Sequence, residues 1–290
     1  MSDTRLKISL ASDRGMIDAA LVVLGTVAEH CSAPLELHFL GHGLRDEDRD
    51  RLAHACDAHG CALVLHALQD EDFGDAVQVN ENIPLVAMAR LLLPRRVSGR
   101  VLYLDCDMLV QGDVAELFEL MPQGAALGAV RDFYVLDQMR PGSERPEKLA
   151  WHSKVLGRSE VEGYFNSGLL LLDCDVIRSD RALMTRMTDF AAANDYRYMD
   201  QDYLNVLFDG RVFYLPQAWN SIWGRDRLRA KTLAELTWLP DAERTPATSK
   251  VIHYTGPNKP WKSQSKLLAL LRGRLPALMK WRRAASGRYA

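Results

Sequence analysis

Residues 100–110 read Arg100-Val-Leu-Tyr-Leu-Asp105-Cys106-Asp107-Met-Leu-Val110. Alternating apolar residues predict a strand that ends at two carboxylates one residue apart, and a second apolar segment follows them. Because alternate side chains of a strand share a face, Asp105 and Asp107 can converge on one point. Two carboxylates held that close repel each other unless a cation lies between them, and their hard oxygen atoms suit Mg²⁺ or Mn²⁺. The stretch therefore predicts a divalent-metal site that neutralises phosphate; the alternative is a pair that only ends a strand and caps a turn.

The composition describes a globular chain with little net charge. With 290 residues, of which 48% are hydrophobic, the chain can build the core of one domain. A formal net charge of -2 argues against a protein that binds nucleic acid through its overall charge. The five cysteines are scattered, and the sequence shows no signal-peptide pattern and no apolar stretch of membrane-spanning length. We therefore expect reduced thiols and a cytoplasmic location.

Strand and helix patterns alternate along the first half of the chain. The expected strands cover residues 6–11, 35–40, 61–66, 101–104 and 126–130, and the expected helices cover residues 16–30, 45–59, 84–93 (ended by Pro94) and 114–120. This repetition predicts an α/β fold with a largely parallel sheet covered by helices, and functional groups at the carboxyl ends of strands. Asp13 and Asp105 lie at two such ends.

The second half of the chain combines an irregular segment with polar clusters. Residues 138–160 are rich in Pro, Gly and charge, which predicts a mobile loop or lid. A strand is expected through residues 169–172 and a helix from there to about residue 193. The cluster at residues 198–205 opens a short helix, a position from which N–H groups and polar side chains face a cleft. A late strand at residues 251–254 delivers His253 into a Gly- and Pro-rich turn.

Blocks spread over most of the chain resemble glycosyltransferase family 8, and within it the bacterial lipopolysaccharide α-galactosyl- and α-glucosyltransferases. The blocks are Asp13, Arg90-Leu-Leu-Leu-Pro94, Val101-Leu-Tyr-Leu-Asp105-Cys106-Asp107, Gly112-Asp113, Phe165-Asn166-Ser167-Gly168, Asp200-Gln201-Asp202-Tyr-Leu-Asn205 and His253-Tyr254-x-Gly256-x-x-Lys259-Pro-Trp261. The resemblance implies a GT-A fold, in which a Rossmann-like nucleotide-binding mixed sheet is flanked by helices. It also implies a UDP-sugar donor, Mn²⁺ (or Mg²⁺), and retention of the anomeric configuration.

Carried over by position, the resemblance assigns roles to individual residues. The implied metal ligands are Asp105, Asp107 and His253. The implied contacts to the UDP part of the donor are Asp13 at the uridine, and Asp105, Gly256 and Lys259 at the diphosphate with its metal. The implied donor-sugar pocket is lined by Arg90, Asn166, Asp200 and Gln201, and Asp132 falls where the family faces its acceptor.

The resemblance implies that the anomeric configuration is retained, but the mechanism of retention must be argued from the chemistry of the residues. A double displacement needs a nucleophile on the sugar face opposite UDP, but the family position for it holds Gln201, whose neutral amide is a poor nucleophile. We expect a front-side path, in which the acceptor hydroxyl attacks from the UDP side while Gln201 and Asp200 stabilise an oxocarbenium-like sugar. The donor would be UDP-glucose or UDP-galactose, and the sequence does not separate them.

Some positions depart from the family pattern, and two other functions stay open. Met16 stands near the position where many members carry an aromatic ring that stacks on uracil, so base preference is less firmly set here. A haloacid-dehalogenase-like phosphatase also has an Asp-x-Asp at a strand end, although its motif usually lies near the start of the core. A nucleotide-sugar-binding protein without turnover is the other alternative.

Two further clusters of potential metal-ligating residues occur in the sequence, and for both of them a structural role is the better interpretation. Asp173-Cys174-Asp175 repeats the metal-like pattern, yet it begins a helix, where Asp173 or Asp175 predicts an N-cap. His54, Cys56, His59 and Cys61 straddle a helix end and a strand, and no paired ligand set follows, which argues against zinc.

The C-terminal segment, residues 262–290, has basic residues and no acidic ones. Its leucines suit one or two short amphipathic helices, which dock on anionic lipid surfaces. We therefore expect a catalytic domain over residues 1–261 and a C-terminal segment that attaches to the inner membrane leaflet. The alternative is a helix that packs on the catalytic domain.

Overall fold

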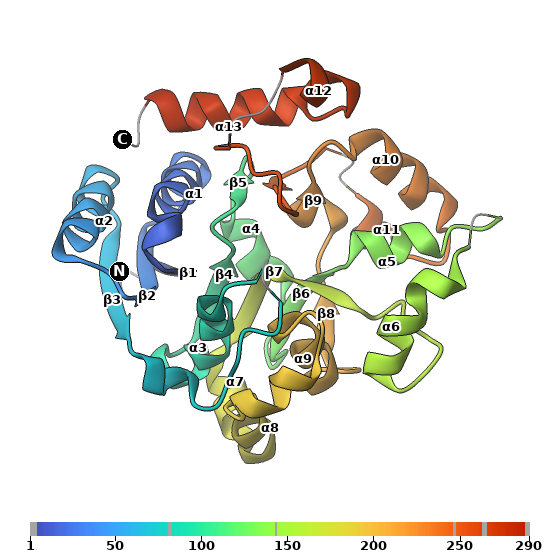
Figure 1. Cartoon of the computed structure of the whole chain (residues 1–290), viewed down its shortest axis with the longest axis horizontal. Helices are drawn as coiled ribbons and strands as arrows, with labels where there is room; N and C mark the ends of the chain where they lie inside the picture. The colour runs from blue at the N-terminus through green and yellow to red at the C-terminus, as the bar shows by residue number, and fades with distance from the viewer. Residues whose placement is uncertain (1–4, 81–82, 143, 246–247, 263–265, 288–290) are drawn as a thin grey trace.

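The structure is a computed structural model that describes residues 5–80, 83–142, 144–245, 248–262 and 266–287 (Figure 1). Its central feature is a seven-stranded sheet of order β3-β2-β1-β4-β7-β6-β8. The strands of this sheet are β1 (Leu6–Ser12), β2 (Leu35–His42), β3 (Ala62–Leu68), β4 (Arg100–Leu104), β6 (Leu127–Arg131), β7 (Phe165–Asp173) and β8 (Val212–Tyr214). The strands β3, β2, β1 and β4 are mutually parallel, whereas β7 runs antiparallel to both β4 and β6. β8 pairs parallel with β6, so among these seven strands only β7 is reversed. The sheet is therefore largely parallel, as the repetition predicted, and mixed, as the resemblance implied.

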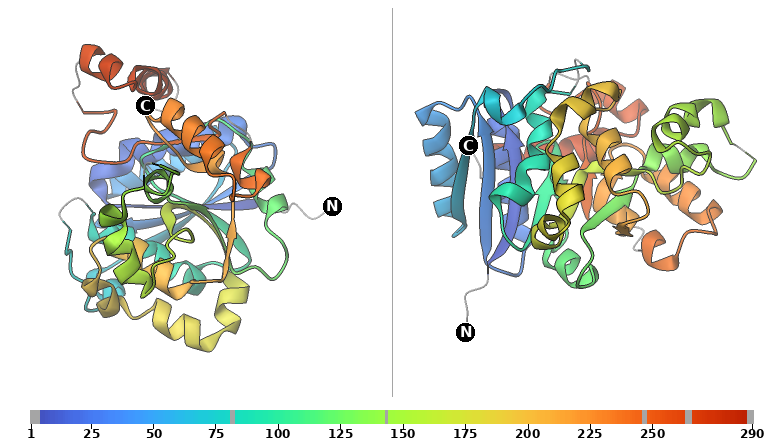
Figure 2. Two further views of the ribbon diagram at one scale, coloured as in Figure 1. Left: turned by 90° about the vertical axis from the view of Figure 1, so that its right-hand side faces the viewer. Right: turned by 90° about the horizontal axis from the view of Figure 1, so that it is seen from below.

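The strand quoted first lies in the middle of the sheet and is buried on both faces. Val101 and Tyr103 of β4 belong to one hydrophobic cluster, and Leu102 and Leu104 belong to the other. The first cluster is covered by α3 (Leu93–Arg96), α7 (Cys174–Ser179), α8 (Arg181–Met187) and α9 (Asp200–Leu207). The second is covered by α1 (Ile17–His30), α2 (Asp46–Ala58), α4 (Ala115–Leu120) and α13 (Leu275–Gly287). Helices thus flank both faces, and Figure 2 shows these layers from two further sides.

A second, three-stranded sheet of order β5-β10-β9 brings His253 close to the Asp-x-Asp motif. Its strands are β5 (Met108–Val110), β9 (Ser221–Ile222) and β10 (Val251–His253). β10 pairs antiparallel with β5 in a register that sets His253 opposite Met108. The backbone N–H of Tyr254 donates to the carbonyl of Asp107 at 2.9 Å. This pairing places a residue from late in the sequence directly beside Asp107.

Two expected helices are broken in the structure. Residues 85–92 form a 3₁₀ helix that continues into α3, and Pro94 lies in the first turn of α3 instead of ending a helix. Proline fits there because the first-turn N–H has no intrahelical partner. The helix expected up to residue 193 consists of α7, α8 and a 3₁₀ helix at Phe190–Asp195. Asp180 and Asp189 cap the second and third pieces, so local side-chain acceptors restart each one.

The segment expected to be a mobile loop contains a regular helix. α5 (Phe133–Gln138) precedes it, and α6 (Pro146–Leu156) follows with proline in its first turn. Gly157 ends α6 with a left-handed φ of 67°. No residue of α6 is fully buried. The segment nevertheless contains a regular helix, so the prediction of a loop over residues 138–160 was wrong for Pro146–Leu156.

The C-terminal segment forms two helices, α12 (Lys266–Leu271) and α13, at one end of the molecule (Figure 1). α13 packs on the preceding part of the chain: Ala277, Leu278 and Trp281 are buried, and the Tyr254 hydroxyl donates to the carbonyl of Ala277 at 2.7 Å. Residues 263–265 and 288–290, including the basic Arg288, lie outside the described residues. Within the described part of the chain, no helix combines the length and the apolar character needed to cross a membrane.

Candidate active site

The predicted metal ligands come together at the carboxyl end of β4. Asp105, Asp107 and His253 each offer one ligand atom, and these atoms lie within 4.8 Å of one another; among the described residues they form the one such group. His253 Nε2 is 3.2 Å from Asp107 Oδ1 and 3.8 Å from Asp105 Oδ2. Two carboxylates and an imidazole fit a divalent ion such as Mn²⁺.

Asp107 is buried between two nitrogen groups. Lys259 Nζ donates to Asp107 Oδ2 at 2.5 Å, and His253 faces its other oxygen. Burial alone would raise the pKa of Asp107, but its contact with His253 and the charge and hydrogen bond of Lys259 outweigh burial and hold that pKa well below its usual value. Asp107 is therefore a carboxylate, the form that binds a cation.

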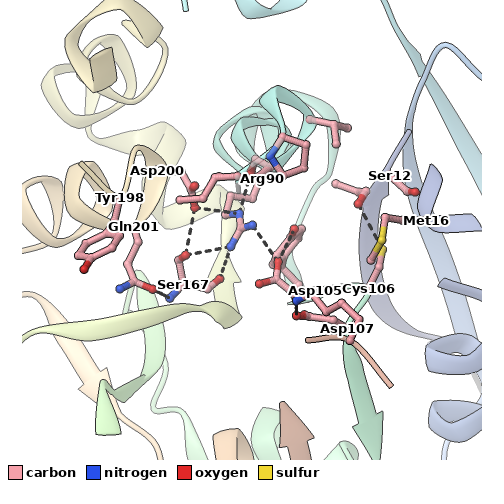
Figure 3. Close-up of a pocket in the computed structure, with 17 residues that line it drawn as sticks. Ser12, Met16, Arg90, Asp105, Cys106, Asp107, Ser167, Tyr198, Asp200 and Gln201 are labelled. Atoms are coloured by element: carbon pink, nitrogen blue, oxygen red, sulfur yellow. Dashed lines mark hydrogen bonds and ion pairs between the residues drawn. The ribbon is translucent and has the colours of Figure 1, made fainter. Parts of the chain in front are cut away.

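Arg90 links the metal motif to the neighbouring helix start (Figure 3). It is 3% exposed, and its Nη2 donates to Asp105 Oδ1 at 2.8 Å. Its Nε lies 3.2 Å from Asp200 Oδ2, and its Nη1 donates to the Ser167 hydroxyl at 3.0 Å. Arg90 thus holds Asp105 and Asp200 in place, and all three residues line one pocket.

Asp200 is a buried carboxylate with an unusual pKa. Burial, together with the nearby charge of Asp105, raises the pKa of Asp200 to about 6, against the opposing effect of Arg90. The Ser167 hydroxyl donates to its Oδ2 at 3.0 Å. A pKa raised in this way is common in functional clefts.

Gln201 and Asn166 are joined by hydrogen bonds at the pocket wall. Asn166 Nδ2 donates to Gln201 Oε1 at 2.9 Å, and the backbone N–H of Ser167 donates to the same oxygen at 3.2 Å. Gln201 lines the pocket with Tyr198 (Figure 3). The sequence analysis missed Asn220, whose Nδ2 donates to Asn166 Oδ1 at 2.8 Å. It lies in no recognisable motif.

The remaining predicted residues surround this centre. Asp13 directly follows β1, and its Oδ1 accepts the Gly15 N–H at 2.8 Å. The nearby residues Ser12 and Met16 line the pocket. Asp132 is 6% exposed; its Oδ1 caps α5 and its Oδ2 accepts from Asn166 Nδ2 at 3.4 Å. Gly256 has a φ of 87° in the turn after β10, a conformation that glycine adopts without strain.

Gly168 was quoted from the sequence without a role, and the structure supplies one. A Cβ at this position would lie 2.5 Å from His253 Cε1 and 2.8 Å from Asp105 Oδ2. The backbone N–H of Asp105 donates to the Gly168 carbonyl at 2.8 Å, so β7 cannot easily move away. A residue without a side chain at this position leaves room for His253 and Asp105, two of the three proposed metal ligands.

The second Asp-x-Asp pattern has the predicted structural role. Asp173 caps α7 by accepting the Val176 N–H at 3.2 Å. Asp175 accepts the Gly99 N–H at 3.0 Å and pairs with Arg178. Neither carboxylate lies in the pocket described above.

Comparison with known proteins identifies relatives that transfer sugars. The family model Glycosyl transferase family 8 matches residues 7–265. Lipopolysaccharide 1,2-glucosyltransferase of Escherichia coli (strain K12) is 33% identical over 167 residues, which cover 56% of this chain and 44% of that protein. Lipopolysaccharide 1,3-galactosyltransferase of Salmonella typhimurium is 25% identical over 238 residues, covering 79% of this chain and 64% of the relative. The chain thus aligns with less than two thirds of either relative.

Solved structures share the fold. The crystal structure of the galactosyltransferase LgtC with donor and acceptor sugar analogs superposes with a TM-score of 0.78 at 24% identity, covering 97% of this chain and 95% of that one. Mouse xyloside xylosyltransferase 1 superposes with a TM-score of 0.59 at 16% identity, covering 87% of this chain and 98% of that one. The mixed sheet with its flanking helices and Asp-x-Asp motif is therefore the GT-A fold, and the family match favours sugar transfer over phosphatase chemistry. The chain belongs to glycosyl transferase family 8.

Proposed function

We propose that this protein moves glucose or galactose from a UDP-sugar to a hydroxyl of a glycan or glycolipid, with retention of configuration, in the synthesis of lipopolysaccharide or another surface polysaccharide. The observation that carries the proposal is the triad of Asp105, Asp107 and His253 beside a pocket lined by Arg90, Asp200 and Gln201. The sugar-transferring relatives support the same reaction class.

The donor's diphosphate would lie at the metal triad. A divalent ion held there, Mn²⁺ or Mg²⁺, would neutralise charge on the diphosphate oxygens. Lys259, which bonds Asp107 in this structure, would pair with a phosphate oxygen. Gly256 would let the backbone approach the diphosphate, and the uridine would lie near Asp13, against Met16.

The donor sugar would lie between Asn166, Asp200 and Gln201. We propose the front-side path, because Gln201 is an amide and the neighbouring Asp202 is fully buried. Asp202 accepts hydrogen bonds from the Tyr164 hydroxyl and the Trp151 indole, so its carboxylate is occupied away from the pocket. The acceptor hydroxyl would approach on the side of Asp132 and lose its proton to the leaving phosphate.

Gln201→Ala is expected to lower kcat by about 100-fold without abolishing transfer, because it removes one stabilising group while the diphosphate contacts remain. Steady-state kinetics with wild-type and variant enzyme measure the effect. Complete loss of transfer, with a glycosyl-enzyme adduct detected by mass spectrometry, would instead support a double displacement.

The C-terminal segment is proposed to attach the enzyme to the cytoplasmic face of the inner membrane, where a lipid-linked acceptor would be found. In α12, Leu267, Leu270 and Leu271 are 67%, 58% and 76% exposed. The flanking cations in the described residues are Lys262, Lys266, Arg272, Arg274, Lys280, Arg282 and Arg283. Exposed leucines beside cations suit an anionic lipid surface.

Leu267→Ser combined with Leu271→Ser is expected to lower binding to phosphatidylglycerol vesicles by at least about tenfold, since each buried leucine contributes roughly 1.5–3 kcal/mol. These side chains are exposed, so the fold should be kept, whereas deleting the whole segment would remove the buried Trp281. Leu120→Ser, at another exposed leucine, is the matched control. Vesicle co-sedimentation that is unchanged in the double variant would refute the attachment.

A donor panel tests the proposed function as a whole. UDP release from UDP-glucose and UDP-galactose, with and without Mn²⁺, is expected to be metal-dependent and to exceed release of GDP from GDP-sugars. A protein that binds UDP without releasing it from any donor would be a non-catalytic binder.

A further inference from the structure

A buried amide, Asn220, connects the proposed metal-ligating histidine to the donor-sugar wall. Asn220 ends a 3₁₀ helix at Gln217–Asn220 and is 3% exposed. Its Oδ1 lies 2.8 Å from His253 Nδ1, and its Nδ2 donates to Asn166 Oδ1 at 2.8 Å. Asn220 does not line the pocket. Any effect on the reaction must therefore pass through its two partners.

Backbone N–H groups fix which atom donates and which accepts in the series of hydrogen bonds that runs from Gln201 through Asn166 and Asn220 to His253. The Gly168 N–H can only donate, and it donates to Asn166 Oδ1 at 3.0 Å. Asn166 must therefore present its Nδ2 to Gln201 Oε1, which also accepts the Ser167 N–H. The opposite assignment of either amide would set two donors against each other.

The same logic fixes the proton on His253. Because Asn166 offers an acceptor to Asn220, Asn220 must turn its Nδ2 toward Asn166 and its carbonyl oxygen toward His253. A neutral His253 then carries its hydrogen on Nδ1. This leaves the lone pair of Nε2 facing Asp105 and Asp107, at 3.8 and 3.2 Å.

A neutral acceptor suits this position electrostatically. Asp105, Asp107 and Asp200 already gather carboxylates within the pocket lining. A fourth carboxylate behind His253 would add negative charge, whereas an amide oxygen selects the tautomer without doing so. Hydrogen-bond partners behind metal-ligating histidines orient the ring and fix its tautomer in this way.

We propose that Asn220 is a positioning residue for the metal centre, which sets the tautomer and ring orientation of His253 and ties them, through Asn166, to Gln201. The inference rests on the proposed function, because it needs His253 to bind the ion. It adds a residue that contacts neither the ion nor the donor.

The test measures Mn²⁺ affinity instead of turnover. The full-length chain is titrated with Mn²⁺ in the presence of UDP, and free Mn²⁺ is read from its electron paramagnetic resonance signal. Asn220→Ala is expected to weaken Mn²⁺ binding by about 10–100-fold. Asn220→Asp, which keeps an acceptor for the Nδ1–H, should keep Mn²⁺ affinity closer to wild type than Asn220→Ala does.

Asn205→Ala is the matched control for loss of a buried amide. Asn205 is 2% exposed and bonds the backbone of Phe165 and Gln201, without contact to His253. It should lower the melting temperature but leave Mn²⁺ affinity within about twofold of wild type, a fraction of a kcal/mol. Equal loss of Mn²⁺ affinity in Asn205→Ala and Asn220→Ala would reduce Asn220 to a structural role and overturn the inference.

His253→Ala separates this inference from the proposed function. If His253→Ala weakens Mn²⁺ binding and Asn220→Ala does not, the inference about Asn220 is wrong and the metal site stands. If His253→Ala also leaves Mn²⁺ binding unchanged, the proposed metal site itself is wrong.

Discussion

Asp107→Asn is expected to lower Mn²⁺-activated sugar transfer by about 100–1,000-fold while the protein stays folded. Asparagine has nearly the same shape as aspartate but carries no charge. The substitution removes one of two carboxylates from the triad and weakens the ion pair between residue 107 and Lys259. Activity assayed over a range of Mn²⁺ concentrations measures the effect.

Asp175→Asn is the matched control, because Asp173-Cys174-Asp175 repeats the same Asp-Cys-Asp pattern. Asp175 lies exposed at the start of α7 and pairs with the half-buried Arg178. Its loss should leave Mn²⁺ activation at the wild-type level. An Asp107→Asn variant with the same Mn²⁺ dependence as wild type would refute the assignment of Asp107.

Gly168→Ala is expected to weaken Mn²⁺ binding by more than about tenfold and to destabilise the protein by roughly 1–3 kcal/mol. The added methyl group would meet His253 Cε1, Asp105 Oδ2 and Met108 Cε at 2.5, 2.8 and 2.9 Å. His253 is held from behind by Asn220, and Asp105 is held by Arg90. Neither ligand can move aside without breaking a hydrogen bond.

Gly128→Ala in β6 provides the comparison for adding a methyl group within the same sheet. Its Cβ would meet the Met121 sulfur at 3.1 Å, the flexible part of a side chain. Mn²⁺ titration and thermal unfolding of both variants measure the two effects. Wild-type Mn²⁺ affinity in Gly168→Ala would contradict the close packing of β7 against the triad.

Sequence patterns correctly predicted the structural features that depend on residues close together in the chain. The apolar residues from Val101 to Leu104 predicted a strand that ends at Asp105, and β4 confirms it. The N-cap role of Asp173 was predicted from its position before a helix. In each case, the residues that determine the feature lie within a few positions of one another.

Features that depend on distant contacts could not be predicted from the residues alone. The antiparallel strand β7 lies between β4 and β6, an order set by tertiary packing. Asn220 is 54 positions from Asn166 and 33 from His253, so nothing near it in the sequence indicates a role. The helix α6 was not predicted, because the Pro, Gly and charged residues around it are typical of loops.

The proximity of His253 to the carboxylate pair came from family resemblance, and the structure gives its physical basis. The antiparallel register of β10 on β5 sets His253 opposite Met108, immediately after Asp107.

Crystals grown with Mn²⁺ and UDP, with data collected at the manganese absorption edge, test the central claim most directly. The account predicts a single strong anomalous peak within coordination distance of Asp105, Asp107 and His253, with the UDP diphosphate beside it. A peak elsewhere, or a diphosphate bound away from these three residues, would contradict it.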